Sequence, residues 1–290
     1  MTIRRSRAIL RAATRTLQAH PRLVWFTVLS AIVSAIVVGI GGALAWLGND
    51  AAAWLPFADA PPEAAKSRSM LVFGLATWFG THLVAPFFAV ALARATLDAM
   101  ASRPWNVKDA LRGAGQRFAT IATFAVLNAS VGGLLARLRG DGSARRAGAA
   151  SRATAKVLGL AWWAATYLAV PVMAREPRSG FAAVGRSASL FRETWREAFI
   201  GRLVLGWLWA PALVIAAVPF VLCLLLKVQH AGVFALAVVL PAFALVLLGV
   251  ILQTLDTIYR CALYVFATEG VVPEPFDDPD LHEIWCVRSE

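Results

Sequence analysis

The sequence predicts an all-α protein, a polytopic bundle of about six transmembrane helices with basic amphipathic helices at the membrane surface. Two observations support this fold class. Hydrophobic residues make up 59% of the 290 residues and charged residues only 16%, a balance that soluble globular domains do not have. The apolar residues are also gathered into long charge-free runs, and arginines lie at the ends of these runs, where lipid head groups lie.

The last apolar run is the clearest membrane span. Residues 231–252 contain no charged side chain, and a helix of this length reaches about 33 Å, close to the thickness of the hydrocarbon core of a bilayer. Five earlier runs have the same character. The expected spans are residues 22–48, 69–100, 118–138, 155–174, 200–226 and 231–268.

These spans predict a single transmembrane domain over residues 1–270, followed by an acidic, proline-rich tail over residues 271–290. The first apolar run exceeds the apolar region of about 7–15 residues in a signal peptide, so we expect it to remain as a span. Residues 118–174 allow two interpretations, because the loop between the two spans carries six basic residues. They form either a hairpin with an anomalous outer loop or a re-entrant element, and the lengths favour the hairpin.

Charge also predicts orientation and location. The loop at residues 48–68 is acidic and proline-bearing and is expected outside, whereas the basic segments place both termini in the cytoplasm. Arginine outnumbers lysine by 24 to 4 and alanine is abundant, a bias typical of GC-rich bacteria. We therefore expect a multi-pass protein of the bacterial inner membrane.

Three basic amphipathic segments are expected to lie at the interface, over residues 3–20, 105–117 and 181–199. Each precedes a pair of spans, so the chain reads as one unit used three times. The third segment has apolar residues at three-and-four spacing. Its predicted lipid-interface residues are Arg186, Phe191, Arg192 and Trp195.

Small residues recur every four positions in the first span. Ala31, Ala35, Gly39 and Ala43 form a seam that lets another helix approach closely. We expect it to pack within the chain, and a dimer seam is the alternative.

Two uncharged polar residues lie deep in predicted spans: His82 in the second and Asn128 in the third. Polar groups in hydrocarbon are costly and need partners. Either they form one interhelical hydrogen bond, which we favour, or they line a cavity or a proton path.

Charged pairs occur near the ends of two spans. Asp256 and Arg260 are separated by four residues in the sixth span, and Arg94 and Asp98 repeat this spacing in the second. One helical turn brings each pair within reach of an ion pair. The favoured interpretation is local neutralisation, and the alternative is a four-member network that joins the two spans. With His82 and Asn128, these residues complete the candidate intramembrane polar network.

No enzyme or cofactor motif is present in the sequence. There is no H-E-x-x-H, no G-x-S-x-G and no phosphate-binding loop, and the four histidines are scattered singly, without the spacing of metal ligands. We expect no enzyme activity, no cofactor and no metal. The three cysteines, Cys223, Cys261 and Cys286, have no C-x-x-C spacing, and we interpret them as small apolar packing residues.

Residues spread over the second half of the chain carry a family resemblance: Ala161, Trp162, Thr166, Pro171, Arg186, Ser187, Leu190, Arg192, Trp195, Tyr259, Arg260, Ala262, Leu263, Tyr264, Ala267, Thr268 and Gly270. With these residues the chain resembles a family of uncharacterised bacterial six-helix membrane proteins, known only as a domain of unknown function. That family in turn is distantly similar to the membrane domain of glycerophosphodiester phosphodiesterases. The resemblance implies a six-helix membrane fold and no known activity. It departs at Ala12-Ala13, where a Ser-Trp pair is expected, and in the basic loop at residues 137–156.

The functional expectation is a non-enzymatic membrane protein that organises lipids, other membrane proteins or envelope processes. The alternative is a transporter or channel for an ion or small solute that uses the intramembrane polar residues. Expected partners are anionic membrane lipids, together with a protein partner or a second copy of the chain. Nucleic acid is not expected despite the net charge of +11, because the basic residues lie at the ends of the spans.

Overall fold

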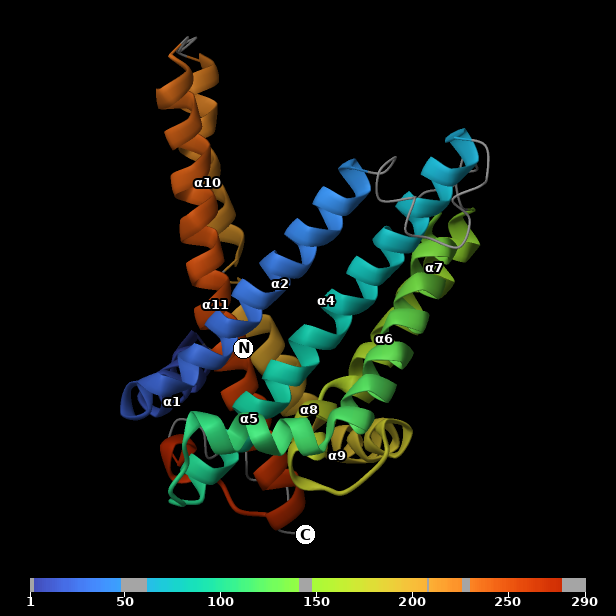
Figure 1. Cartoon of the computed structure of the whole chain (residues 1–290). Helices are drawn as coiled ribbons and strands as arrows, with labels where there is room; N and C mark the ends of the chain where they lie inside the picture. The colour runs from blue at the N-terminus through green and yellow to red at the C-terminus, as the bar shows by residue number, and fades with distance from the viewer. Residues whose placement is uncertain (1–2, 48–61, 141–147, 208, 226–229, 278–290) are drawn as a thin grey trace.

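The computed structural model describes residues 3–47, 62–140, 148–207, 209–225 and 230–277. Within these ranges the chain forms helices and no strand, which confirms the predicted all-α class (Figure 1). In chain order the elements are α1 Ile3–Ala19, η1 Pro21–Leu23, α2 Val24–Trp46, α4 Pro62–Met100, α5 Val107–Gln116, α6 Phe118–Arg139, α7 Ala149–Thr166, α8 Ala169–Arg175, α9 Gly180–Trp207, α10 Trp209–Leu225, α11 Ala231–Glu269 and η2 Glu274–Phe276.

Five stretches of helix in the described part of the chain are long and apolar enough to cross a membrane, which fits a multi-pass membrane protein. They are Pro21–Leu44, Met70–Met100, Phe118–Arg139, Ala149–Arg175 and Gly232–Glu269. The fifth of the six expected spans corresponds to a shorter apolar helix, Trp209–Cys223.

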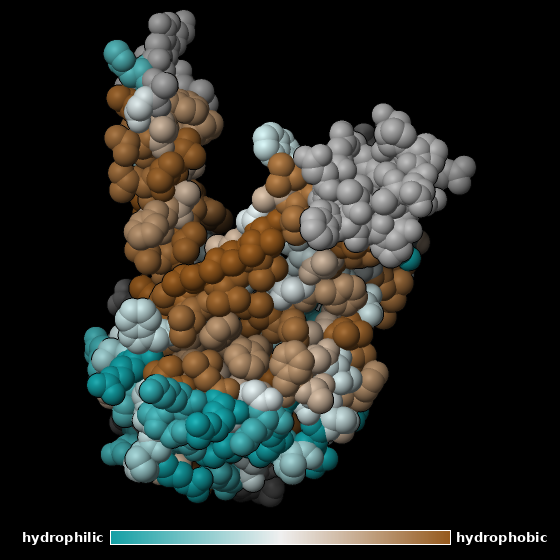
Figure 2. All heavy atoms as spheres, viewed as in Figure 1, coloured by the Kyte–Doolittle hydropathy of each residue, from teal (hydrophilic) through white to brown (hydrophobic). Residues whose placement is uncertain are grey.

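The molecule has an apolar part and a polar base (Figures 1 and 2). The base comprises α1, α5, α8, the first part of α9, η2 and the C-terminal ends of α4 and α11. α4 and α11 each contain 39 residues, so each reaches about 58 Å, nearly twice the thickness of the hydrocarbon core. Both helices therefore cross the apolar part and still extend into the base.

The most closely packed region lies in the base. Residues 90–93 of α4 and 258–263 of α11 include side chains that are almost wholly buried, as are Val172 and Met173 of α8. Further along the same long helices, large apolar side chains are exposed, for example Leu71 at 61% and Val239 at 61%. Exposed apolar surface of this extent is expected where lipid rather than water is the solvent.

Helices form over all three segments expected to be amphipathic, and α1 packs one of its faces against protein. In α1, Ala8, Ile9, Ala12 and Ala13 are at most 2% exposed, and the helix packs on α11, α9 and η2. This face of α1 therefore contacts protein, and the contact of α1 with lipid stays a prediction. Three of these four side chains are alanine methyl groups, which let α1 approach the bundle closely, and Ile9 fills the space between them.

α2 packs along α4, but not through the predicted seam. A Cβ on Gly41 would lie 1.7 Å from Thr77 Oγ1, and one on Gly80 would lie 2.9 Å from Val37 Cγ1, so these glycines mark the real contact. A Cβ on Gly39 would meet nothing within 4 Å. Two residues along an α-helix correspond to a turn of about 200°, which places Gly39 on the opposite side from Gly41. The predicted intramolecular role of the seam is wrong for its exposed members Ala35, Gly39 and Ala43.

α6 leaves the base and α7 returns beside it, so the two helices form an antiparallel pair. Ser151 Oγ donates to the carbonyl of Leu138 at 2.6 Å and ties the far ends together. With 22 residues, α6 reaches about 33 Å, enough to cross the hydrocarbon core.

Of the cysteines, Cys223 and Cys261 are buried and free, as expected of packing residues. Three predicted features lie outside the described residues: the acidic outer loop at 48–61, the part of the tail at 278–290, and Cys286.

Candidate functional site at the boundary between spans and base

The two deepest polar residues form local contacts. Asn128 Oδ1 on α6 accepts a hydrogen bond from Trp162 Nε1 on α7 at 2.8 Å. His82 Nδ1 lies 2.8 Å from the backbone oxygen of Trp78 in the same helix, and the two rings are tilted at 45° with centroids 4.5 Å apart. Asn128 therefore stabilises the α6–α7 pair, as the favoured interpretation states, and His82 bonds within its own helix.

A helix break lies between α7 and α8. Pro171 has no N–H, so the carbonyl of Tyr167, four residues earlier, has no intrahelical donor. The amide of Leu168 also leaves the helical pattern and donates to Ser187 Oγ on α9 at 3.0 Å. The break thus presents one carbonyl and one amide to neighbouring helices.

Arg260 of α11 occupies the break. Its Nη1 lies 3.5 Å from the carbonyl oxygen of Tyr167, and its guanidinium carbon lies 4.7 Å from the centre of the Tyr167 ring. Its Nη2 pairs with Asp256 Oδ2 at 2.5 Å. The predicted Asp256–Arg260 pair is therefore formed, and it holds α11 against the junction of α7 and α8.

The second predicted pair, Arg94 with Asp98, is wrong. Asp98 Oδ1 instead pairs with Arg175 Nη1 at 2.9 Å, because α8 packs on the end of α4 and brings its last residue to that carboxylate. Arg94 points toward α5, where a Cβ on Gly113 would lie 2.5 Å from Arg94 Nε. The two charged turns are consequently joined through α8, and no direct four-member network links α4 to α11 among the described residues.

Glu176 lies in the loop after α8, and the sequence analysis did not single it out. Its carboxylate contacts three side chains. Its carboxylate pairs with Arg178, lies 3.5 Å from Arg186 Nε and accepts from the Tyr264 hydroxyl at 3.2 Å. Arg117, which precedes α6, donates to its backbone oxygen. A signal was available, because Glu176 is the only acidic residue between Asp141 and Glu193, in a strongly basic stretch.

The predicted lipid-interface residues of α9 fare differently from one another. Arg186 pairs with Glu176, and the ring of Phe191 packs edge-on against Trp163 at 5.5 Å, so both contact protein with part of their surface, and their contact with lipid stays a prediction. Arg192 is exposed, and the side chain of Trp195 lies outside those that the structure describes. The buried stripe of α9 consists of Ala183, Ser187, Leu190 and Thr194.

Together these contacts lock helices to one another. Each of the carboxylates of Asp98, Glu176 and Asp256 is paired with arginine, so none is poised as a free base. No group of three or more potential metal ligands occurs among the described residues. The ion pairs and hydrogen bonds of this site hold α4, α8, α9 and α11 in position relative to one another.

The model of a family of unknown function, DUF6159, matches residues 69–273, from the first part of α4 to the residue before η2. No curated protein matches the chain. The match supports the resemblance to an uncharacterised family and gives no support to the more distant likeness to glycerophosphodiester phosphodiesterase membrane domains. Since the matched residues cover well over half of the sequence, the chain belongs to this family of unknown function, DUF6159.

Proposed function

We propose that this protein is a non-enzymatic, multi-pass protein of the bacterial inner membrane that organises lipid or another membrane protein around its spans. The base lies in the cytoplasm in this proposal, with both chain ends on that side. Most cationic side chains of the described residues belong to the base, in agreement with the positive-inside tendency.

The proposal rests on one observation: polar side chains inside the apolar part form hydrogen bonds between helices. Asn128 and Trp162 bond to each other, and Thr27 Oγ1 on α2 bonds to Thr254 Oγ1 on α11 at 2.8 Å. A transport path requires polar groups that face a substrate or water. Here Asn128, Trp162, Thr27 and Thr254 serve helix–helix contacts and His82 bonds within its own helix. This use of the polar groups favours an organising role over the alternative of a transporter or channel.

The shape of the apolar part also supports this role. Beyond the Thr27–Thr254 contact, the α10–α11 pair stands apart from α2, and both arms present apolar surface (Figure 2). α11 exposes large side chains such as Leu236 and Phe243, at 60% and 61%. In a bilayer, lipid chains or another apolar helix must fill the space between the arms.

Flux measurements and co-purification test the proposal. The full chain, reconstituted in proteoliposomes, is expected to conduct no offered ion or small solute above empty vesicles. Asn128→Leu and Asp256→Asn variants are the matched probes. Flux that either substitution abolishes would replace the organising role with the transport alternative. Mass spectrometry of the material purified in mild detergent is expected to find retained lipid or a partner membrane protein.

A further inference from the structure

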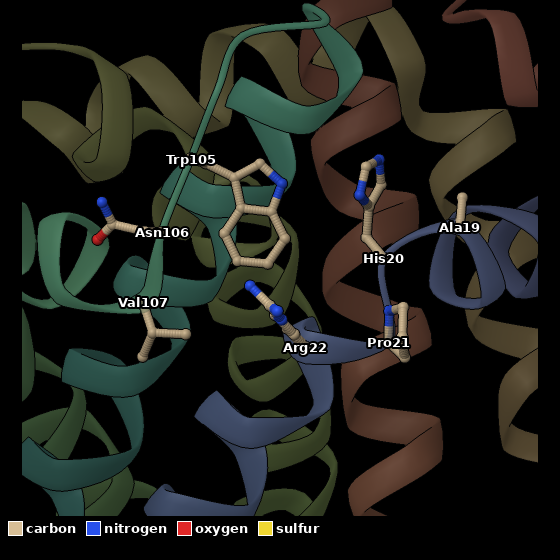
Figure 3. Close-up of a pocket in the computed structure, with 7 residues that line it drawn as sticks. All are labelled: Ala19, His20, Pro21, Arg22, Trp105, Asn106 and Val107. Atoms are coloured by element: carbon tan, nitrogen blue, oxygen red, sulfur yellow. The ribbon is translucent and has the colours of Figure 1, made fainter.

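The base contains an open cavity where the start of the first span meets α5. It has a volume of about 290 Å³ and lies between the η1 turn and the residues that lead into α5 (Figure 3). A second cavity, of about 510 Å³, adjoins it and shares Arg22, Asn106 and Val107. Small-molecule sites typically have about 300–1,000 Å³, so the combined space suits a ligand group of that size.

The lining of this space is cationic. Arg22, Lys108 and Arg112 contribute three positive charges, and Asp109 contributes one negative charge, for a formal balance of +2. The Asp109 carboxylate already accepts a hydrogen bond from Asn106 Nδ2 at 2.5 Å, which leaves it less able to neutralise the cations. The lining therefore favours an anion.

The three cations have no internal ion-pair partner within the described part of the chain. This distinguishes them from Arg175, Arg178 and Arg260 elsewhere in the base, whose charges are paired with carboxylates. Their guanidinium and ammonium groups keep their donors available for an external phosphate, which arginine can contact with two parallel hydrogen bonds.

Aromatic side chains form the remaining walls. Trp105 is half-buried, and its ring lies edge-on to His20 with centroids 5.9 Å apart. Figure 3 shows His20 beside Trp105 and the guanidinium of Arg22 pointing toward the same indole. Trp25, on the first turn of α2, is 58% exposed and borders the second cavity.

The cavity lies where the exposed apolar surface of α2 begins, and this position favours a lipid over a soluble anion as its ligand. Trp25 precedes the exposed apolar surface of α2, where Ile32 and Ile36 are at least 50% exposed. Tryptophan is enriched at the depth of lipid head groups, and a basic pocket beside a span suits an anionic head group. An anion bound by Arg22 would thus have its acyl chains in contact with an apolar helix.

We propose that this cavity, named the α2–α5 pocket and formed around Arg22, Trp25, Trp105, Lys108 and Arg112, binds the phosphate head group of an anionic phospholipid. The inference rests on the proposed function for its placement in the membrane and names the class of lipid. The site joins two segments about eighty residues apart in sequence, one around Arg22 and Trp25 and the other around Trp105 to Arg112.

The test measures binding of single lipids to the full chain in detergent by native mass spectrometry, with phosphatidylglycerol and phosphatidylcholine as the probes. Wild-type protein is expected to bind phosphatidylglycerol more tightly. Arg22→Gln combined with Arg112→Gln is expected to weaken that binding about thirtyfold, since each basic residue near an anionic head group contributes on the order of 1 kcal/mol and 1.4 kcal/mol is tenfold.

The matched control removes two exposed arginines of the base that lie outside the pocket. Arg15→Gln combined with Arg103→Gln deletes the same charge and is expected to change binding less than threefold. The pocket variant with lysine at both positions, Arg22→Lys with Arg112→Lys, is expected to retain part of the affinity because it keeps the charge but loses the paired hydrogen bonds. All substituted side chains are exposed, so folding is expected to be unchanged, as a thermal melt verifies.

Three results would overturn the inference. Wild-type protein that binds the two lipids equally has no anionic head-group site. Equal losses in the pocket and control variants would assign the binding to general surface charge. Glycerol 1-phosphate that competes as well as phosphatidylglycerol would assign the pocket to a soluble phosphate ester. If the lipid-binding test fails and the proteoliposomes show no solute flux, the α2–α5 pocket is refuted and the organising role is not. If the proteoliposomes show flux and the lipid selectivity is found, the organising role is refuted and the pocket is not.

Discussion

The contact between α2 and α4 yields the sharpest prediction, because neighbouring glycines in α2 differ completely in their surroundings. A Cβ on Gly41 would lie 1.7 Å from Thr77 Oγ1, 2.9 Å from Thr77 Cβ and 3.0 Å from Thr77 Cγ2. Rotation about χ1 of Thr77 moves Oγ1 and Cγ2 but leaves Cβ in place. Gly41→Ala can therefore be accommodated only if the two helices separate.

The magnitude follows from two opposing effects. Overpacking costs about 1–3 kcal/mol, and replacing glycine by alanine in a helix returns up to about 1 kcal/mol. Gly41→Ala is expected to destabilise the protein by about 1–2 kcal/mol on balance. A Cβ on Gly42 would meet nothing within 4 Å, so Gly42→Ala is expected to be neutral or slightly stabilising.

Thermal unfolding of the detergent-solubilised chain, followed by fluorescence-detected size exclusion, measures the difference. At about 2–4 °C per kcal/mol, Gly41→Ala is expected to melt several degrees below Gly42→Ala. Thr77→Ala in the Gly41→Ala background should recover part of the loss, since it removes two of the three crowded atoms. A Gly41→Ala variant as stable as Gly42→Ala would refute the packing described for α2 and α4. Gly39→Ala as the only destabilising change would restore the seam predicted from sequence.

Three further predictions concern α9, the α6–α7 pair and the end of α4. Gly180→Ala would place a Cβ 2.8 Å from backbone atoms of α6, so it is expected to lower the melting temperature. Gly185→Ala adds a Cβ in open space on the same helix and is expected to leave the melting temperature unchanged. Equal melting temperatures of the two variants would contradict the α6–α9 contact. Asn128→Leu and Trp162→Phe each remove the same 2.8 Å hydrogen bond, and each is expected to lower the free energy of unfolding by about 0.6–1.7 kcal/mol. The double variant is expected to lose no more than the larger single effect. Additive losses would show that the two side chains do not share this bond. Ser102 has a left-handed φ of 52°, so Ser102→Gly is expected to stabilise by up to about 1 kcal/mol in chemical denaturation, and a loss of stability would show that its hydroxyl matters more than its backbone.

Much of the architecture was readable from the sequence, because the relevant signals are local. The length and apolarity of a run decide whether it forms a membrane helix, whatever its neighbours are. The three amphipathic segments were predicted for the same reason, since the helical period acts within a few turns. The hydrogen-bonding role of Asn128 was also favoured from sequence, although its partner Trp162 was not.

The candidate site was harder to predict, since its partners come from distant segments. Glu176 contacts Arg117 before α6, Arg186 of α9 and Tyr264 of α11. No spacing in the sequence relates these positions. The Asp98 carboxylate had a candidate partner one turn away, but Arg175 pairs with it instead. An ion pair forms with whichever cation the packing brings into reach at low cost in side-chain entropy.

The sequence by itself determined that this chain forms apolar helices with basic amphipathic companions, because helix formation and burial in lipid depend on short-range periodicity and composition. Only the tertiary structure decided which faces meet: Gly41 rather than Gly39 on α2, the alanine-rich face of α1 against the bundle, Arg260 in the break that Pro171 creates, and the α2–α5 pocket. The physical reason is that contacts between helices depend on the fit of two surfaces, and each surface is encoded in a separate part of the chain.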